Sequence, residues 1–258
     1  MTKVFLALID GMRPDGLDAS GHPLYRDLLQ NSLYTMQMRT VMPSVTLPCH
    51  MSLFHSVSTD RHGILTNTYV PQVRPVNGIC EVLAAKGMTT ALFYTWEPLR
   101  DLVRPLSITR AFYACGKVCS YTVADKMVAD DAERMIQSGF HPDFIFFYQC
   151  QSDEAGHKYG WMSDEYIQAI RNALDNVQHL TELLPEDYKV IVTADHGGHN
   201  RIHGTDLPED MTIPFFMRHS SIAPGKLTGE VCITDIAPTV VKMLGVEPDP
   251  DWEGKALL

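Results

Sequence analysis

Short apolar runs alternate with amphipathic stretches along the chain. Val4 to Ile9 is a continuous apolar run, which is typical of a strand buried on both faces of a sheet. The pattern predicts strands at 4–9, 89–94, 144–148, 190–193 and 212–217, and helices at 78–85, 121–138, 163–184 and 236–244. This alternation predicts an α/β fold, a three-layer sandwich in which a mostly parallel central sheet is covered by helices on both faces.

Capping signals and apolar stripes define two of these helices more closely. Ser163 is the expected N-cap of the longest helix, which has Asp164 and Glu165 in its first turn. Gly139 is the expected stop of the helix at 121–138. The helical period predicts that this helix buries Val123, Met127, Val128, Ala132 and Met135.

Polar residues follow three of the predicted strands. Asp10 follows the strand at 4–9, Asp153 the strand at 144–148, and Asp195 the strand at 190–193. Ligands of parallel sheets bind outside the carboxyl ends of the strands. We therefore expect these residues to converge on one edge of the sheet.

The domain organisation follows from what separates these elements. No Pro/Gly/Ser-rich linker, internal repeat or low-complexity segment divides the chain. We predict a single catalytic domain over residues 1–258. The turn-rich segment 65–77 and the segment 95–120 are predicted to form small lid or cap elements over the site.

The net charge of −10 and the absence of a Lys/Arg cluster exclude polymeric nucleic acid as the expected partner. A small phosphorylated substrate is compatible with the acidic composition, because bound divalent cations reverse the sign of the charge at a site built from carboxylates. No apolar stretch approaches the ~20 residues of a membrane span. The run that starts at Met1 is too short for a signal peptide. We therefore predict a cytoplasmic protein without a membrane partner.

Six cysteines stand at irregular positions, 49, 80, 115, 119, 150 and 232, and are interpreted as reduced thiols. Cys115 and Cys119 form a C-x3-C pair. No second Cys or His pair lies nearby, so two thiols in a loop or short strand are favoured over a metal site.

Two segments have the residue types of metal ligands. Asp153 and His157 are four residues apart and can reach one cation, although a surface turn after a strand is an equal alternative. Asp195 and His196 are adjacent, and neighbouring ligands need an unusual loop. Gly197 and Gly198 are expected to supply that conformational freedom. The nearby histidines at 199 and 203 favour metal binding over a solvated loop.

Thr46 lies in the stretch P-S-V-T-L-P-C-H, where it can stand at the entrance to a helix. Unpaired N–H groups and the helix dipole favour an anion there. A hydroxyl bound to a divalent cation becomes a nucleophile. From the local sequence alone, however, the favoured interpretation is that Thr46 or Ser44 is merely an N-cap.

Five motifs follow one another in the order L-I-D-G-M-R-P-D, P-S-V-T-L-P-C-H, D-R-H-G-I-L-T-N, S-D-E-A-G-H and A-D-H-G-G-H. Together they resemble the type I phosphodiesterase/nucleotide pyrophosphatase branch of the alkaline phosphatase superfamily, over roughly residues 4–245. The resemblance implies an alkaline-phosphatase-like fold with two divalent metal ions. Mixed nitrogen and oxygen ligands suit Zn²⁺, with Mn²⁺ or Fe²⁺ as alternatives.

The resemblance also implies roles for individual residues. Thr46 is implied as the nucleophile, and Asn67 as an amide donor to a phosphate oxygen. The implied ligands of one metal are Asp10, Thr46, Asp195 and His196. The implied ligands of the second metal are Asp153, His157 and a third histidine, which is His203 rather than the alternative His199.

Two positions depart from related patterns. Cys49 stands where the family commonly has Asn, and His50 stands where sulfatases have Arg. Thr46 cannot become formylglycine, so sulfatase chemistry is disfavoured.

The implied function is hydrolysis of a phosphodiester or pyrophosphate bond through a phosphothreonine intermediate. A nucleotide is one candidate substrate. One alternative is a phosphomonoesterase or phosphonate hydrolase on the same scaffold, and another is a metal-binding module without turnover. A monoesterase needs an extra cation near the third phosphate oxygen. Arg13 and Arg61 are the candidates closest to the motifs.

Overall fold

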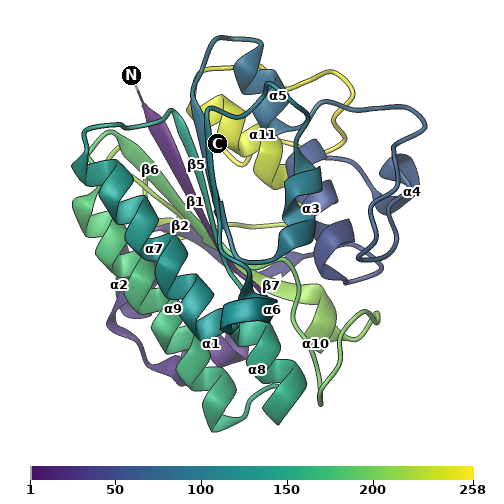
Figure 1. The fold of residues 1–258 in the computed structure, drawn as a ribbon, viewed down its shortest axis with the longest axis vertical. Helices are drawn as coiled ribbons and strands as arrows, with labels where there is room; N and C mark the ends of the chain where they lie inside the picture. The colour runs from purple at the N-terminus through teal and green to yellow at the C-terminus, as the bar shows by residue number, and fades with distance from the viewer. Residues whose placement is uncertain (1) are drawn as a thin grey trace.

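The computed structural model describes residues 2–258, which form one eight-stranded sheet flanked by helices (Figure 1). The strand order across the sheet is β4-β3-β5-β1-β6-β7-β2-β8. In chain order the strands are β1 (Lys3–Ile9), β2 (Leu33–Arg39), β3 (Thr90–Tyr94), β4 (Arg110–Tyr113), β5 (Phe144–Gln149), β6 (Tyr188–Thr193), β7 (Thr212–Arg218) and β8 (Gly225–Lys226).

The strands in the middle of the sheet are parallel. β1 pairs in parallel with β5 on one side and with β6 on the other, and β3 continues the parallel run beyond β5. β7 is antiparallel to both of its neighbours, β6 and β2. The side chains of β1 from Val4 to Ile9 are fully buried, because helices cover both faces of a parallel sheet.

The helices form the outer two layers. In chain order they are α1 (Pro14–Ser20), α2 (Pro23–Asn31), α3 (Thr46–His55), α4 (Thr59–His62), α5 (Ile79–Ala84), η1 (Glu97–Leu102), α6 (Gly116–Cys119), α7 (Tyr121–Gln137), α8 (Gln151–Tyr159), α9 (Asp164–Leu183), α10 (Pro208–Met211), η2 (Ile233–Asp235) and α11 (Ile236–Met243). Helices α1, α2, α7 and α9 cover one face of the sheet, and α3, α5 and α11 lie on the other (Figure 1).

The predicted fold class is confirmed, and every strand and helix predicted from the apolar pattern is present within a few residues. Ser163 is the N-cap of α9, where its side chain accepts a hydrogen bond from the backbone N–H of Tyr166. Several elements carried no clear pattern. β4 is a short edge strand with no buried residue, and α8 is a largely polar helix of nine residues.

The apolar stripe predicted for α7 is partly wrong. Val128, Ala132 and Met135 are buried as expected, but Val123 and Met127 are 47% and 42% exposed. Ala124 and Ala129 take part in the buried face instead. The helical period allows two neighbouring stripes on this helix, and packing against β3 and β5 selects the one with smaller side chains.

Two further expectations concern the connecting segments. All six cysteines are free thiols. Cys115 is the N-cap of the short helix α6 and Cys119 is its last residue, so the pair is not in a loop or strand as predicted. Residues 65–77 form no helix or strand, whereas 95–120 includes η1, β4 and α6. Whether either segment covers the site stays a prediction. Within residues 2–258, no helix has the length and apolarity needed to cross a membrane.

Candidate metal centre and nucleophile

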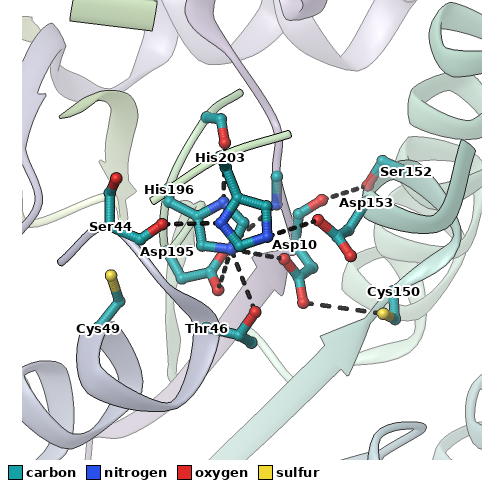
Figure 2. A network of polar contacts seen from close by, with 12 residues as sticks. Asp10, Ser44, Thr46, Cys49, Cys150, Ser152, Asp153, Asp195, His196 and His203 are labelled. Atoms are coloured by element: carbon teal, nitrogen blue, oxygen red, sulfur yellow. Dashed lines mark hydrogen bonds and ion pairs between the residues drawn. The ribbon is translucent and has the colours of Figure 1, made fainter. Parts of the chain in front are cut away.

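The carboxyl ends of the three central strands bring together the polar residues that follow them. Asp10 comes directly after β1, and Asp195 follows β6 by two residues. Asp153 lies in the first turn of α8, which begins two residues after β5 ends. Because β1 lies between β5 and β6, these carboxylates meet at one point of the sheet edge (Figure 2).

The first cluster, called here the Asp10 group, consists of Asp10, Asp195 and His196. One ligand atom from each lies within 4.8 Å of the others. His196 Nε2 is 3.3 Å from Asp10 Oδ1 and 3.4 Å from Asp195 Oδ2. The Thr46 hydroxyl is 3.1 Å from the same nitrogen. All four side chains are buried.

The second cluster, called here the Asp153 group, consists of Asp153, His157 and His203, again with ligand atoms within 4.8 Å. His157 Nε2 and His203 Nε2 are 3.5 Å and 3.7 Å from Asp153 Oδ1. His199 lies elsewhere, because its Nδ1 contacts Asp210 Oδ1 at 2.8 Å. Of the two histidines left open by the sequence, His203 is the one that faces Asp153.

The three histidines of the two groups share one orientation. Nδ1 of His157, His196 and His203 donates to the backbone carbonyls of Arg201, Gly197 and Ser44, at 2.8–2.9 Å. A carbonyl only accepts, so each Nδ1 carries a proton and, in the neutral imidazole, the lone pair is on Nε2. Backbone hydrogen bonds therefore direct the three Nε2 atoms into the site, an orientation that metal-binding histidines commonly show.

Each of the three carboxylates has one buried oxygen atom that lacks a hydrogen-bond partner in the described part of the chain and suits a cation. Asp10 Oδ1, Asp153 Oδ1 and Asp195 Oδ2 are buried and have no hydrogen-bond partner within residues 2–258. Buried polar atoms are normally paired, so each of these oxygens calls for a ligand outside the chain. The residues present fit two divalent cations, one per group.

Burial also perturbs the titration of these groups. Burial, reinforced by the neighbouring carboxylates Asp195 and Asp153, raises the pKa of Asp10 well above its ordinary value. Burial raises the pKa of Asp195 to about 8. Burial, then the neighbouring His203, lowers the pKa of His196 well below its usual range. Clustered groups with perturbed pKa values are typical of functional sites.

Thr46 is the first residue of α3 and is not its N-cap. The cap position belongs to Val45, and no side chain caps this helix. The Ser44 hydroxyl instead donates to the carbonyl of Thr205 at 2.8 Å. The N-cap interpretation is therefore wrong for both residues, because tertiary contacts to the 196–205 loop use the two hydroxyls.

Asn67 lies beside the nucleophile candidate. Its Oδ1 accepts a hydrogen bond from the backbone N–H of Leu47 at 3.0 Å. The side chain is on the exposed segment 65–77, so its amide nitrogen stays open to a ligand. Asn67 thus contacts Leu47, the residue after Thr46, across twenty residues of sequence.

The expectation for Gly197 and Gly198 is corrected. Neither has a positive φ, so conformational freedom is not what requires glycine. A Cβ on Gly197 would lie 2.0 Å from the carbonyl oxygen of Glu209, and one on Gly198 would lie 2.2 Å from the ring of Trp161. Close packing of the loop that carries His196 is the reason for both glycines.

Sequence reasoning missed two buried contacts of the Asp10 group. The hydroxyl of Tyr148, at the end of β5, donates to Asp10 Oδ2. His50, one turn after Thr46, has Nδ1 2.8 Å from the Thr46 carbonyl and 3.4 Å from Asp195 Oδ2. Tyr148 lies inside an apolar run that gives no such signal. His50 was noted only as a departure from sulfatases.

The two arginines near the motifs are engaged away from the clusters. Arg13 pairs with Asp15, and its Nη1 donates to the carbonyl of Gly198 at 2.8 Å. Arg61 donates to the carbonyl of Arg74 at 2.7 Å. Neither makes a contact with Thr46 or with a carboxylate of the two groups.

Comparison with known sequences identifies relatives of the chain. Residues 4–203 match the family described as type I phosphodiesterase / nucleotide pyrophosphatase. Ectonucleotide pyrophosphatase/phosphodiesterase family member 1 of Rattus norvegicus is 25% identical over 217 residues, which are 73% of this chain and 23% of that protein. The chain thus spans about a quarter of the length of this curated relative.

Solved structures show the same fold. Murine ectonucleotide pyrophosphatase/phosphodiesterase 5, an inactive threonine-to-alanine variant in complex with AMP, is similar with a TM-score of 0.80 and 15% identity, over 97% of this chain and 96% of that one. A 2-O GAG sulfatase has the same TM-score at 12% identity, over 99% and 73% of the two chains. The fold is that of the alkaline phosphatase superfamily, which includes different chemistries.

Proposed function

The chain belongs to the type I phosphodiesterase/nucleotide pyrophosphatase family, and from this premise we propose that it hydrolyses a phosphodiester or pyrophosphate bond with Thr46 as nucleophile. The observation that carries the proposal is the position of the Thr46 hydroxyl, 3.1 Å from His196 Nε2 and beside buried carboxylate oxygens that lack partners. On this proposal residues 1–258 act as a single catalytic domain. The substrate is a small phosphorylated molecule, with a nucleotide as one candidate.

The two groups described above are the proposed ligand sets. The Asp10 group together with Thr46 would hold one cation, and the Asp153 group would hold the other. When bound, the two cations would neutralise charge on the phosphoryl oxygens and lower the pKa of the hydroxyl and of an attacking water. The mixed carboxylate and imidazole donors favour Zn²⁺, with Mn²⁺ or Fe²⁺ as alternatives.

The chain's own groups account for positioning. Thr46 is the first residue of α3, so its hydroxyl lies at the positive end of the helix dipole, which suits an anionic phosphoryl group. Asn67 would donate its amide nitrogen to a phosphate oxygen, and the hydrogen bond that its Oδ1 accepts from the backbone N–H of Leu47 supports this role. These contacts would fix the phosphorus in line with the attacking oxygen.

Two displacements complete the proposed reaction. Thr46 Oγ1 loses its proton to solvent and bonds to phosphorus, and the bond to the leaving oxygen breaks, which gives a phosphothreonine and a released alcohol or phosphate that takes up a proton from solvent. A water molecule then loses one proton and bonds to the same phosphorus, and the bond to Oγ1 breaks. Oγ1 takes up a proton, which restores the hydroxyl and releases a phosphomonoester. The structure of the murine relative, an inactive threonine-to-alanine variant in complex with AMP, supports a reactive threonine in a site of this kind.

The arginine contacts favour a diester over a monoester substrate. A monoester presents one more charged oxygen than a diester, and Arg13 and Arg61 are both engaged elsewhere. Without such a cation, a third charged oxygen would stay uncompensated in the site. We therefore rank phosphomonoesterase activity below phosphodiesterase activity. A phosphonate monoester carries the same single charge as a diester, so phosphonate hydrolase activity ranks lower only because of the family match. A metal-binding module without turnover ranks below all three.

A comparison of substrates tests this ranking. We expect the metal-loaded protein to hydrolyse bis(p-nitrophenyl) phosphate with a higher kcat/KM than p-nitrophenyl phosphate, a phosphonate monoester or a sulfate ester. The measurement is the rate of p-nitrophenol release at matched metal content. A higher kcat/KM for the monoester would contradict the diester assignment, and no turnover of any substrate would favour the metal-binding module.

A further inference from the structure

Cys150 lies at the metal centre although no role has been given to it so far. Its Sγ, one carboxylate oxygen of Asp10 and one of Asp153 all lie within 4.8 Å of one another. Figure 2 shows the thiol directed at the Asp10 carboxylate, with Sγ 3.7 Å from Asp10 Oδ2. This third cluster joins the two groups, because Asp10 belongs to one of them and Asp153 to the other.

The surroundings of the thiol indicate a ligand position rather than simple packing. Cys150 is 3% exposed and connects β5 to α8, the helix that carries Asp153 and His157. Asp10 is 1% exposed, and its Oδ1 has no hydrogen-bond partner within residues 2–258. The buried thiol therefore contacts Asp10 Oδ2, which also accepts from the Tyr148 hydroxyl, while Oδ1 of the same carboxylate has no partner within residues 2–258. It also shares the carboxylates of Asp10 and Asp153 with the proposed cations.

The other cysteine close to Thr46 does not have this arrangement. Cys49 lies on α3, three residues after Thr46, and its Sγ accepts a hydrogen bond from the Thr40 hydroxyl at 3.1 Å. It belongs to none of the three clusters of potential ligands found within residues 2–258. Cys49 is thus a buried thiol near the same site that forms, among the described residues, no cluster of potential ligands with two carboxylates, and it serves as the matched control.

We propose that Cys150 supplies a thiolate ligand to the metal centre and makes the centre prefer thiophilic cations, such as Cd²⁺ and Zn²⁺, over Mg²⁺. On binding, the S–H bond breaks, the proton leaves to solvent and Sγ forms the bond to the metal. Thiolate is a soft ligand, whereas a site of carboxylates and waters suits hard cations. The inference rests on the proposed two-metal function.

Cadmium titration tests the proposal directly. All proteins carry Cys115→Ser and Cys119→Ser, which remove the half-buried thiols beside α6. Metal-stripped protein titrated with Cd²⁺ is expected to develop the ultraviolet thiolate-to-cadmium charge-transfer absorption. In the Cys150→Ser variant we expect this absorption to disappear and Cd²⁺ affinity to fall by about 10- to 100-fold, the range typical of perturbed metal sites. Mg²⁺ affinity is expected to change little.

The control variant Cys49→Ser is expected to keep the absorption at full amplitude. Absorption that survives in Cys150→Ser, or that disappears in Cys49→Ser instead, would overturn the assignment. Cd²⁺ binding to the parent protein without any charge-transfer absorption would overturn the thiolate ligand but leave the two-metal proposal standing. No Cd²⁺ binding at all would overturn both.

A second measurement needs no substitution at Cys150, and so holds if that variant fails to fold. Cadmium-113 NMR of the Cys115→Ser/Cys119→Ser protein separates ions that have a sulfur ligand from ions that have only nitrogen and oxygen ligands. We expect at least one resonance in the sulfur-shifted range. Resonances confined to the nitrogen and oxygen range would contradict the proposal.

Discussion

At the scale of single residues, the site depends on where each polar atom is forced to point. His157, His196 and His203 each donate Nδ1–H to a backbone carbonyl, which leaves Nε2 free toward the carboxylates. The Thr46 hydroxyl can only donate to His196 Nε2, because that nitrogen carries the lone pair. The Thr46 oxygen thus accepts no hydrogen bond within residues 2–258, and its lone pairs stay available to a ligand.

Substitution of Thr46 tests its proposed role as nucleophile independently of metal binding by the other proposed ligands. We expect Thr46→Ala to lower kcat by at least about a thousandfold, because loss of a nucleophile removes the covalent route while binding contacts persist. Bound metal is expected to stay near two equivalents, since Asp10, Asp195 and His196 remain. The measurements are steady-state turnover of a diester and metal analysis of the same sample.

Two matched variants sharpen this test. Thr46→Ser keeps a hydroxyl at the same position and is expected to keep measurable turnover. Ser44→Ala removes a hydroxyl that bonds only to the Thr205 carbonyl and should change kcat little. Full activity in Thr46→Ala would rule out Thr46 as the nucleophile.

At the scale of elements, helix α8 is held in place by a residue of α7. Asp125 Oδ1 accepts the backbone N–H of Cys150 at 3.0 Å, and Oδ2 accepts that of Gln151 at 2.9 Å. Cys150 is the N-cap of α8 and makes no side-chain cap bond of its own. Burial raises the pKa of Asp125 to about 7, while these two backbone bonds oppose the shift. A carboxylate from another helix thus takes the place of a local cap.

Loss of this contact should loosen the helix that presents Asp153 and His157. In Asp125→Asn the amide has one acceptor oxygen, so one buried N–H loses its partner, at a cost of about 1–3 kcal/mol. We expect faster hydrogen exchange of the Cys150 and Gln151 amides and weaker binding of one of two metal equivalents. Exchange mass spectrometry of metal-free protein and calorimetric metal titration are the measurements.

Asp131→Asn is the control for Asp125→Asn. Asp131 is also a buried carboxylate of α7, but it forms ion pairs with Arg110 and Arg134 and not hydrogen bonds to the backbone of α8. Its substitution is expected to lower stability without changing exchange at the start of α8. Equal exchange at Cys150 in both variants would show that Asp125 does not position this helix.

At the scale of the whole molecule, the site concentrates negative charge in a protein whose net charge is already −10. Three carboxylates from the ends of three strands lie close together in the interior. Burial is the main reason that the pKa values of Asp10, Asp153 and Asp195 are raised. The fold therefore carries an electrostatic cost that bound cations would relieve.

The stability of the metal-free protein should fall as pH rises. In the unfolded chain these carboxyls titrate near their ordinary values, about pH 4. In the folded state the pKa of Asp195 is about 8, so the folded protein binds more protons across this window. The contribution of Asp195 to the free energy of unfolding is therefore full near pH 4 and is lost as the pH rises toward 8. Cation binding needs the deprotonated forms, so metal affinity should rise over the same range.

Thermal unfolding with and without metal measures both effects. After chelation we expect a lower Tm at pH 8 than at pH 7, a window above the ordinary histidine pKa in which the lowered pKa values of buried histidines such as His196 contribute little. At pH 8, Zn²⁺ at a hundredfold excess over its Kd should raise Tm by roughly 5–10 °C. The Asp195→Asn variant should show a weaker dependence of the metal-free Tm on pH. A metal-free Tm that rises from pH 7 to pH 8 would contradict the charge argument.

The order and type of the main elements were determined by the sequence alone, since buried strands and amphipathic helices leave a periodic pattern. The convergence of Asp10, Asp153 and Asp195 could be predicted too, because each follows a strand and parallel strands end at one edge. Short or edge elements such as β4 and α8 left too little periodicity, and α7 allowed two adjacent stripes. The residues proposed as ligands and nucleophile came from ordered motifs, not from any one position.

Only the tertiary structure decided which groups face one another. It shows that His203 faces Asp153, whereas His199 contacts Asp210. Sequence spacing could not distinguish the two histidines, because both lie on one loop. The structure brings Tyr148, His50 and Cys150 against the carboxylates from segments far apart in sequence. It also requires Gly197 and Gly198 for close packing. Periodicity records which residues are buried, whereas contact partners depend on how strands are ordered across the sheet.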